Sequence, residues 1–600
     1  MSGLLPPEAR LQFSEGMHPP EGYRLGMLAG TTYSMDFLTA LTVPLAVEAR
    51  ATVDRSLMAG KEIEVLAALK RAAARVAIFV EAGNIGQFST QASRLAALME
   101  GAIHQIQPAR GTSFHPKLWA MRFDPVDGSG PVVTRLLVLS RNLTQDRSWD
   151  VALRLEGAVS AKRHDNNSNL CAFIGYLCKA SGRPAATLKP LVDALAQTSW
   201  SLPPGYDEFE FVAHHPGSRS QWVPRPSKRL AVVSPFCDPR GLEILGQATE
   251  EAILVSTDEW LAQLPHTSRP SQCWVLSQAA APEPLEETEP PSAFSETASG
   301  LHAKIYLGES GSKRSLTIAS GNATGAGLSA GKNVEVFATL SGKGDKAGRI
   351  GLEEDEGLLG GKGWGRFLVR WTPRELTEEE SGKAAAERAL WNYRQVVCEA
   401  MPQLSCKPVH GGYDLVLGFQ GTLATPGAIR GLRASLATRK DWHAWEGAPL
   451  GLGTVDLHEL SLFVAFEATH VDGLKDTFVA KATGVGFPSA SDRFDAALAQ
   501  VIDGPDGFLR FASALLDPVL GQDTGHGGTR GAGTGSSGGP MPPPMLETML
   551  DAYLAEDGTA RIKVLGEVVD VARRTRPSWL TPAFEDLWTT FQQASGRSRP

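Results

Sequence analysis

The sequence predicts an α/β protein in which one structural unit occurs twice and both copies contribute to a shared site. Two observations support this fold class. Short apolar and β-branched segments alternate with segments of helical spacing through the first part of the chain, an order typical of a mixed sheet flanked by helices. A small set of polar residues also occurs twice, each time beside such apolar segments. We therefore expect two α/β half-domains that pack together as a pseudo-dimer.

The repeated residues follow the pattern H-x-K, then S-x-N-x-T, then [DE]-V-x-x-x-L-x-G. The first copy begins at His115 and ends at Gly157, and the second begins at His302 and ends at Gly342. A lone H-x-K is most often part of an ordinary strand with one solvated face. Two copies with the same companion residues are hard to explain in that way, so the repeat predicts a duplicated fold.

Composition divides the chain further. We expect a first half-domain over residues 1–195, a second over 205–372, and an accessory domain of mixed β character over 385–518. Residues 519–544 are dominated by Gly, Ser, Thr and Pro, which cannot bury a core, so this segment is expected to be a flexible linker. Residues 545–600 have the spacing of short helices and are expected to form a helical tail.

The individual elements repeat in a similar order in both halves. In the first half, the pattern predicts strands at 24–31, 76–80, 114–123 and 135–140 and helices at 53–75 and 170–181. In the second half, it predicts strands at 230–234, 252–256, 273–276, 301–307 and 315–320 and a helix at 241–247. The accessory domain is expected to hold a helix at 384–400 and strands at 413–419, 460–468 and 477–485.

The motif residues are expected on strands, where alternate side chains point to the same side. His302 and Lys304 would then share one face, while the apolar residues of 301–307 face a core. His115 and Lys117 match them in the first copy. Pro116 lies between these two and lacks an N–H, so it indicates an edge or a bulge there.

Two such half-sites brought together can act on a phosphodiester. Lysines neutralise the charge that builds on phosphorus oxygens, and Asn and Ser side chains hydrogen-bond those oxygens. One histidine can attack phosphorus while the other protonates the leaving oxygen, and a carboxylate can fix each ring's tautomer. Because lysines supply the positive charge, this chemistry needs no metal. The expected catalytic residues are His115, Lys117, Asn142, His302, Lys304 and Asn322, supported by Ser140, Asp150, Ser320 and Glu335.

Simpler interpretations stay open for the supporting residues. Ser140 and Ser320 could cap the turn after each strand, and Asp150 and Glu335 could be surface carboxylates. The basic segment 214–229 contains a tryptophan and could track a nucleic-acid strand. A solvated loop between the halves explains that segment more simply.

Bulk properties narrow the class of protein. The formal net charge of −8 argues against a surface that is basic throughout, although a local basic groove is compatible with it. The six cysteines form no C-x-x-C pair and suit a reducing cytoplasm. The start has no basic segment followed by an apolar one, so we expect no secretion signal. Asp36 near the middle of the apolar segment 25–47 argues against a membrane span there.

The paired motifs resemble those of the phospholipase D superfamily, including its nuclease and tyrosyl-DNA phosphodiesterase branches. The resemblance covers roughly residues 20–372. The usual family repeat continues as H-x-K-x-x-x-x-D, but this chain has Arg122 at that position in the first copy and Glu309 in the second. The glycine that usually precedes the serine is Leu139 in one copy and Ala319 in the other. Loss of the aspartate is similar to the tyrosyl-DNA phosphodiesterase variant and disfavours phospholipid hydrolysis.

The resemblance implies two phospholipase D-like half-domains, a phosphohistidine intermediate and no cofactor. We take His115 as nucleophile and His302 as acid, although the near symmetry of the copies leaves the reverse assignment open. Nucleic acid is the expected substrate, DNA ahead of RNA, and bacterial proteins of this type include restriction and phage-defence effectors.

Two other functions remain open. One is a lipid-directed phospholipase, and the other is a non-catalytic module that binds nucleic-acid ends. The C-terminal region is expected to select a substrate or a protein partner, and the sequence leaves the oligomeric state undetermined.

Overall fold

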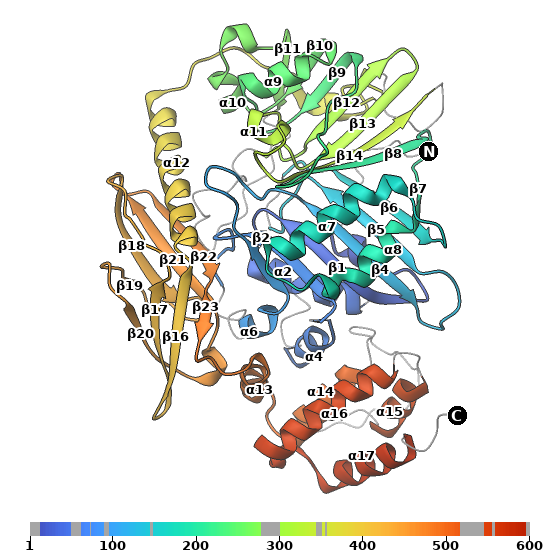
Figure 1. The fold of residues 1–600 in the computed structure, drawn as a ribbon, viewed down its shortest axis with the longest axis vertical. Helices are drawn as coiled ribbons and strands as arrows, with labels where there is room; N and C mark the ends of the chain where they lie inside the picture. The colour runs from blue at the N-terminus through green and yellow to red at the C-terminus, as the bar shows by residue number, and fades with distance from the viewer. Residues whose placement is uncertain are drawn as a thin grey trace, which may run out of the picture.

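The computed structural model describes residues 13–49, 62–72, 74–88, 95–144, 148–277, 300–343, 351–353, 357–516, 545–554 and 558–595. The expected linker at 519–544 lies outside the described residues, as does the first part of the helix expected at 53–75. Within the described part, the fold is α/β with several mixed or antiparallel sheets (Figure 1).

The first sheet has seven strands in the order β3-β2-β1-β4-β5-β6-β7. Its strands are β1 (Tyr23–Thr32), β2 (Val76–Glu81), β3 (Ile103–Ile106), β4 (Leu118–Pro125), β5 (Val133–Leu139), β6 (Ala152–Val159) and β7 (Thr198–Ser201). The helices of this part are α1 (Phe13–Met17), α2 (Phe37–Ala49), α4 (Glu62–Ala72), α6 (Ala96–Met99), α7 (Ser168–Ala180) and α8 (Lys189–Ala196).

The second sheet has eight strands in the order β15-β11-β10-β9-β12-β13-β14-β8. Its strands are β8 (Glu208–His214), β9 (Ser227–Val233), β10 (Thr249–Val255), β11 (Gln272–Leu276), β12 (Ile305–Ser310), β13 (Lys313–Ala319), β14 (Glu335–Gly342) and β15 (Leu368–Arg370). The helices beside it are α9 (Pro239–Gly246), α10 (Asp258–Gln263) and α11 (Gly325–Leu328).

Apart from β15, the two sheets have the same strand directions, and six strands follow the same chain order in both. The edge strand differs: β7 comes after the other strands of its sheet in the chain, whereas β8 comes before those of its sheet. In each sheet, three parallel strands are followed by four strands that pair antiparallel with their neighbours. One hydrophobic cluster contains residues of both sheets, among them Leu136 and Val138 of β5 and Leu316 and Ile318 of β13. The sheets therefore share a core where they meet (Figure 1).

Each sheet buries its other face separately. The far face of the first sheet packs on α2 and α4 through residues such as Leu41, Leu69 and Ile78. The far face of the second sheet packs on α9 and α10 through Leu245 and Leu261. Each sheet is thus buried on both sides, which accounts for the nearly continuous apolar character of the parallel strands.

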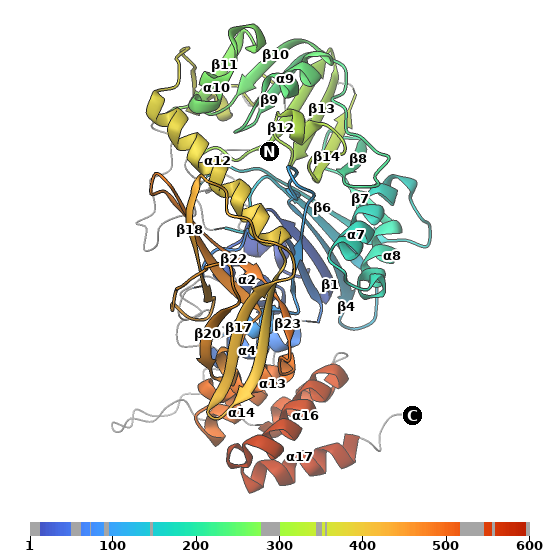
Figure 2. The ribbon, with the colours of Figure 1, turned by 60° about the vertical axis from the view of Figure 1, so that its left-hand side comes forward.

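The α12 helix (Glu378–Glu399) runs from the second sheet to two further sheets, as Figure 2 shows. These sheets have the orders β20-β17-β16-β23 and β19-β18-β21-β22. Their strands are β16 (Pro402–Val409), β17 (Gly412–Phe419), β18 (Ile429–Leu436), β19 (His443–Ala444), β20 (Leu450–Val455), β21 (Phe463–His470), β22 (Lys475–Lys481) and β23 (Thr483–Val485). Both sheets share one core with Leu390, Tyr393 and Val397 of α12.

The last described elements are helical. They are α13 (Ala490–Val501), α14 (Pro505–Leu516), α15 (Met545–Leu554), α16 (Gly558–Thr575) and α17 (Pro582–Ser595). They pack around one cluster that also includes Leu66 of α4, so the final helices are anchored to the first part of the chain. Among the helices that the structure describes, none combines the length and apolar character needed to cross a bilayer.

The prediction that the H-x-K residues lie within strands is wrong. β4 begins at Leu118 and β12 begins at Ile305, so both motifs immediately precede a strand. Phe114 instead forms an isolated parallel bridge with Val334, and Leu301 forms one with Trp149. Each motif segment therefore pairs with the opposite half of the chain before it joins its own sheet.

Candidate active site

The two motif copies meet where the two sheets meet, and each histidine contacts a carboxylate of the other copy. His115 Nδ1 lies 3.2 Å from Glu335 Oε2 and 3.1 Å from the carbonyl oxygen of Ser320. The backbone N–H of His115 donates to the carbonyl of Val334 at 3.0 Å. Glu335 is the first residue of β14, so the start of this strand holds the carboxylate against the His115 ring.

These contacts determine the tautomer of His115. A carbonyl oxygen and a carboxylate oxygen can only accept, so Nδ1 carries the hydrogen. Nε2 then presents its lone pair, which accepts from the Lys117 ammonium at 2.9 Å. Lys117 also donates to the His115 carbonyl at 3.2 Å. In the neutral ring, Nε2 therefore carries the lone pair required of a nucleophile or general base, and the Lys117 ammonium occupies that lone pair in this structure.

The electrostatics of this pair favour an ionised Glu335. Burial alone would raise the pKa of this fully buried carboxyl. The charges of His115 and Lys117 and the hydrogen bonds from His115 and Ser320 outweigh that effect and hold the Glu335 pKa below its ordinary value. The carboxylate is therefore charged at neutral pH and stabilises positive charge on the ring.

His302 has the reciprocal arrangement with looser geometry. Its Nδ1 lies 3.8 Å from Asp150 Oδ1, and its backbone N–H donates to the carbonyl of Trp149 at 2.9 Å. Lys304 Nζ donates to the His302 carbonyl at 2.9 Å. Asp150 lies two residues before β6 and is partly exposed, whereas Glu335 is buried. The two histidines therefore have matching partners in unequal environments.

Both serines join the end of one strand to the start of the next. The hydroxyl of Ser140 contacts Asp150 Oδ1 at 3.2 Å and accepts the backbone N–H of Val151 at 2.9 Å. The hydroxyl of Ser320 donates to Glu335 and accepts the N–H of Val336 at 2.9 Å. Each serine thus fixes the carboxylate that faces a histidine, in addition to capping the strand-to-loop turn.

Asn142 and Asn322 occupy equivalent positions, three residues after β5 and β13 respectively. Both are largely buried. The residue after each asparagine is held by a hydroxyl that the sequence motif did not identify. Thr32 accepts the N–H of Leu143 at 3.0 Å, and Ser234 accepts the N–H of Ala323 at 2.9 Å and donates to Asn322 Oδ1 at 3.4 Å. Thr32 ends β1 and Ser234 directly follows β9, both central parallel strands. A hydroxyl residue at the end of such a strand is the sequence signal that could have identified them.

The residues at the family's usual aspartate position are turned to other partners. Arg122 pairs with Asp124 at 2.8 Å, and Glu309 pairs with Arg314 at 2.8 Å while accepting the N–H of Leu352. Neither pair contacts a motif histidine through these bonds. Arg122 and Glu309 therefore lie within β4 and β12, where they form ion pairs away from the two histidines.

The asymmetry between Arg141 and Gly321 has a steric cause. A Cβ at Gly321 would lie 2.7 Å from the Phe337 ring and 2.9 Å from the Gly327 carbonyl oxygen, so only glycine fits. Arg141 has room to donate to the Thr144 carbonyl at 2.9 Å, and its Nε lies 4.0 Å from Asp150. The first copy thus places an additional cation beside its carboxylate.

Two further residues beside His115 were missed in the sequence. The Tyr33 ring lies 5.1 Å from the His115 ring and 5.7 Å from Lys117 Nζ. Glu81, at the end of β2, accepts the hydroxyl of Ser113 at 2.7 Å and the N–H of Phe114 at 2.6 Å. Neither residue belongs to a repeated motif, so spacing alone could not identify them.

The basic segment 214–229 does not form an open track. Trp222 is buried and stacks on Phe337 with ring centroids 4.7 Å apart. The backbone N–H of Trp222 donates to His214 Nε2 at 2.8 Å, and Arg225 pairs with Glu208 and Glu210. Trp222 is therefore part of the core under the second sheet and is not available to stack on a base.

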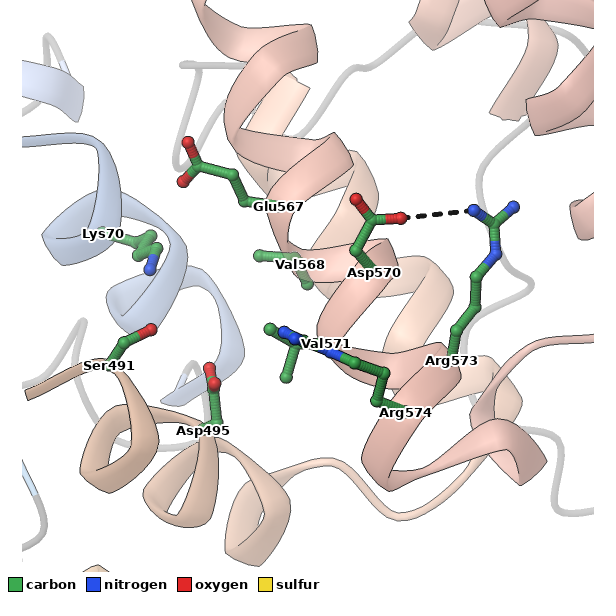
Figure 3. A pocket seen from close by; sticks show the side chains of 9 residues that line it. All are labelled: Lys70, Ser491, Asp495, Glu567, Val568, Asp570, Val571, Arg573 and Arg574. Carbon is green, nitrogen blue, oxygen red and sulfur yellow. Dashed lines mark hydrogen bonds and ion pairs between the residues drawn. The ribbon is translucent and has the colours of Figure 1, made fainter. Parts of the chain in front are cut away.

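A cavity of about 620 Å³ lies between α4, α13 and α16, away from the motif residues (Figure 3). Its lining carries charges of both signs, and Asp570 pairs with Arg573 at 3.3 Å. The lining residues are Lys70, Ser491, Asp495, Glu567, Val568, Asp570, Val571, Arg573 and Arg574. None of the predicted catalytic residues contributes to it.

Comparisons with known proteins found similarity only at the level of solved structures. No protein-family model and no curated protein matches the chain. Two mutants of yeast tyrosyl-DNA phosphodiesterase superpose with TM-scores of 0.33 at 8% and 10% identity, covering 54% and 53% of this chain and 84% and 83% of theirs. Polyphosphate kinase from Porphyromonas gingivalis superposes with a TM-score of 0.28 at 13% identity, covering 53% of this chain and 43% of the kinase. Similarity at this level identifies neither a family nor an activity, so the geometry of the two-histidine site has to carry any functional assignment.

Proposed function

We propose that the protein is a metal-independent phosphodiesterase that cleaves nucleic acid through a phosphohistidine intermediate. The observation that carries this proposal is the crossed pairing of the motif copies. His115 faces Glu335 and His302 faces Asp150, each across the seam between the sheets. In this proposal residues 1–195 and 205–372 are the two halves of a pseudo-dimer, and His115, Lys117, Asn142, His302, Lys304 and Asn322 surround the reacting phosphate.

His115 is the proposed nucleophile because two acceptors hold the hydrogen on Nδ1, so that Nε2 carries the lone pair, which Lys117 releases when it turns to the phosphate. Nε2 attacks phosphorus and forms a P–N bond, while the P–O bond to the leaving oxygen breaks and His302 gives that oxygen its proton. Neutral His302 then takes a proton from water, the resulting hydroxide attacks phosphorus, and the P–N bond breaks. Lys117 and Lys304 neutralise the charge that builds on the phosphate oxygens, which is the task that a metal ion performs in other phosphodiesterases.

The choice of nucleic acid over lipid rests on the motif departures at Arg122 and Glu309 and on the expected lack of a secretion signal and a membrane helix. The order DNA before RNA follows the resemblance of the motifs to the tyrosyl-DNA phosphodiesterase branch. A role as a restriction or phage-defence effector is proposed by analogy with proteins carrying these motifs. The C-terminal sheets and helices are proposed to select the substrate or a protein partner. All six cysteines are free thiols, which supports a reducing compartment such as the cytoplasm.

Cleavage of labelled DNA and RNA, single- and double-stranded, in the presence of EDTA tests the activity. We expect cleavage by the parent protein and a loss of about 10³-fold or more in His115→Ala and His302→Ala, because both histidines act in the chemical step. His266→Ala, at an exposed position, is the matched control and should retain the parent rate. Parent-like cleavage by either motif variant would disprove the shared site. Cleavage of phosphatidylcholine without cleavage of nucleic acid would reassign the substrate to lipid.

The roles of the two histidines can be separated with a substrate whose leaving group needs no proton. With a p-nitrophenyl ester of thymidine phosphate, His302→Ala should still form the P–N bond and accumulate an acid-labile, base-stable adduct. His115→Ala should give no adduct. The opposite result would exchange the two roles.

A further inference from the structure

The α12 helix contacts the chain segments that surround His115. The Trp391 indole donates to the Tyr33 hydroxyl at 3.2 Å, and the Gln395 amide donates to the Thr112 carbonyl at 3.2 Å. Gly83, in the turn after β2, approaches the helix so closely that a Cβ there would lie 2.6 Å from Cys398 Sγ. One helix face therefore lies against the segments that lead into the first motif.

A chain of buried hydrogen bonds runs from the C-terminal sheets through α12 toward the motif. Arg394 binds the Asp476 carboxylate of β22 through two nitrogens, and its third nitrogen donates to Asn84 Oδ1. The Asn84 amide then donates to Glu81 Oε1 at 2.9 Å. Arg394, Asp476, Asn84 and Glu81 are each at most 5% exposed, so water does not substitute for these partners.

Glu81, the last residue in this series of hydrogen bonds, fixes the two residues that precede His115. Glu81 Oε2 accepts the Ser113 hydroxyl and the Phe114 N–H. Phe114 pairs with Val334 in the bridge that brings His115 to Glu335. The position of the His115 ring thus depends on a backbone segment that Glu81 holds from the opposite side.

The donor and acceptor roles along this series of hydrogen bonds require an arginine at position 394. A guanidinium only donates, so it fixes the Asn84 oxygen toward α12 and the Asn84 amide toward Glu81. A planar fork can bind the Asp476 carboxylate with two nitrogens while the third reaches Asn84, but a lysine ammonium cannot span both partners. Without this fork, the Asn84 side chain is free to rotate and Glu81 loses a donor.

We propose that Arg394 is a positioning residue for His115, acting through Asn84 and Glu81 on residues 113–115. This inference rests on the proposed function, and it extends the active-site assembly from the two motif halves to α12 and the C-terminal sheets. It assigns a role in catalysis to a residue that touches neither the substrate nor either motif histidine.

The proposed role of Arg394 should make activity depend on pH through the protonation of Glu81. Burial raises the pKa of Glu81 to about 7, while hydrogen bonds from Ser113 and Phe114 and the charges of His115 and Arg394 oppose the shift. Cys398 of α12 also faces Glu81, and burial raises the pKa of its thiol to about 12, so it stays neutral. Removing the Arg394 charge should raise the Glu81 pKa further, so that protonation releases the Phe114 N–H at a higher pH.

The test compares Arg394→Lys and Arg394→Gln with Arg493→Lys in the full-length protein. Arg493 is a matched control because it is also buried, pairs with Glu100 at 2.8 Å and joins the C-terminal region to the first part of the chain. Its partner leads to the N–H of Leu462 and not to residues 113–115. We expect Arg394→Lys to lower kcat about 10- to 100-fold with KM within about threefold, since small misplacement of a reacting group has such effects. Arg493→Lys should lose stability but keep kcat within about twofold.

The pH profile and the histidine signals separate positioning from mere structural support. Arg394→Gln should move the acid limb of the kcat profile to higher pH, and Arg394→Lys should move it less because it keeps a charge. In ¹⁵N-histidine-labelled protein, the His115 ring resonances should shift in Arg394→Lys and not in Arg493→Lys. Parent values of kcat, acid limb and His115 resonances in folded Arg394 variants would overturn the inference. If the parent protein cleaves no phosphodiester, the proposed function fails, while the His115 resonances still decide the positioning role.

Discussion

The carboxylates beside the two histidines differ in their surroundings, although the sequence repeats them. Glu335 is 1% exposed and receives hydrogen bonds from His115, Ser320 and Asn333. Asp150 is partly exposed and lies 3.8 Å from His302. The two histidines, to which different roles are proposed, therefore face carboxylates in different surroundings.

The lowered pKa of Glu335 predicts how its contribution to stability depends on pH. The folded state holds this group ionised to lower pH than the unfolded chain does, so its contribution is complete above the ordinary carboxyl pKa of 4.5 and is lost as pH falls below it. Glu335→Gln should therefore be less stable than the parent at pH 7, and the difference should shrink at pH 4. Urea unfolding at both values measures it. Asp150→Asn, at the partly exposed carboxylate, is the control and should show the smaller change. An equal pH dependence in both variants would contradict this view of Glu335.

The turn after β2 packs directly against α12. Gly83 has a φ of +80°, and a Cβ there would meet Cys398 Sγ at 2.6 Å and Arg394 Cγ at 3.1 Å. Gly83→Ala should lower stability by about 2 kcal/mol or more, through both backbone strain and displacement of α12. Gly182→Ala is the matched control, since Gly182 has a φ of +68° and open space around its Cβ position. Thermal unfolding of both variants separates contact from strain, and equal losses would show that α12 does not press on this turn.

Elements with a regular local pattern were predictable, and the motif segments were not. The apolar residues of 301–307 face the shared core as expected, since Leu301, Ala303, Ile305 and Leu307 all belong to it. The strand expected there nevertheless begins only at Ile305. The reason is that Leu301 pairs with Trp149 of the other half, and a partner so distant in the sequence leaves no local pattern.

The residues of the site also differ in whether the sequence could identify them. Glu335 could be proposed because its motif repeats, and so could Ser140 and Ser320. Glu81 and Arg394 could not, because one ends a buried strand and the other lies within a helix whose spacing suggests only an ordinary amphipathic face. Their roles arise from tertiary hydrogen bonds, which composition and periodicity do not encode.

At the scale of the whole molecule, the last helices stabilise the first part of the chain through a common core. Trp588 of α17 is 1% exposed in the cluster that includes Leu66 of α4 and Phe511 of α14. Trp588→Ala should lower the free energy of unfolding by about 3–5 kcal/mol, through lost burial and the cavity left behind. Thr589→Ala, at the exposed neighbouring position, should change it by less than about 0.5 kcal/mol. Urea denaturation provides the comparison, and similar stabilities of the two variants would show that α17 is not part of a common core.

The crossed pairing of His115 with Glu335 also bears on how the protein is made. A ribosome synthesises His115 long before Glu335, and Arg394 later still, so a growing chain that contains only the first half has no partner to orient its histidine. The second half in turn needs Asp150 to be already folded beside it. Under the proposed function, a nascent chain that holds only the first half would therefore lack a complete site until Glu335 has been synthesised.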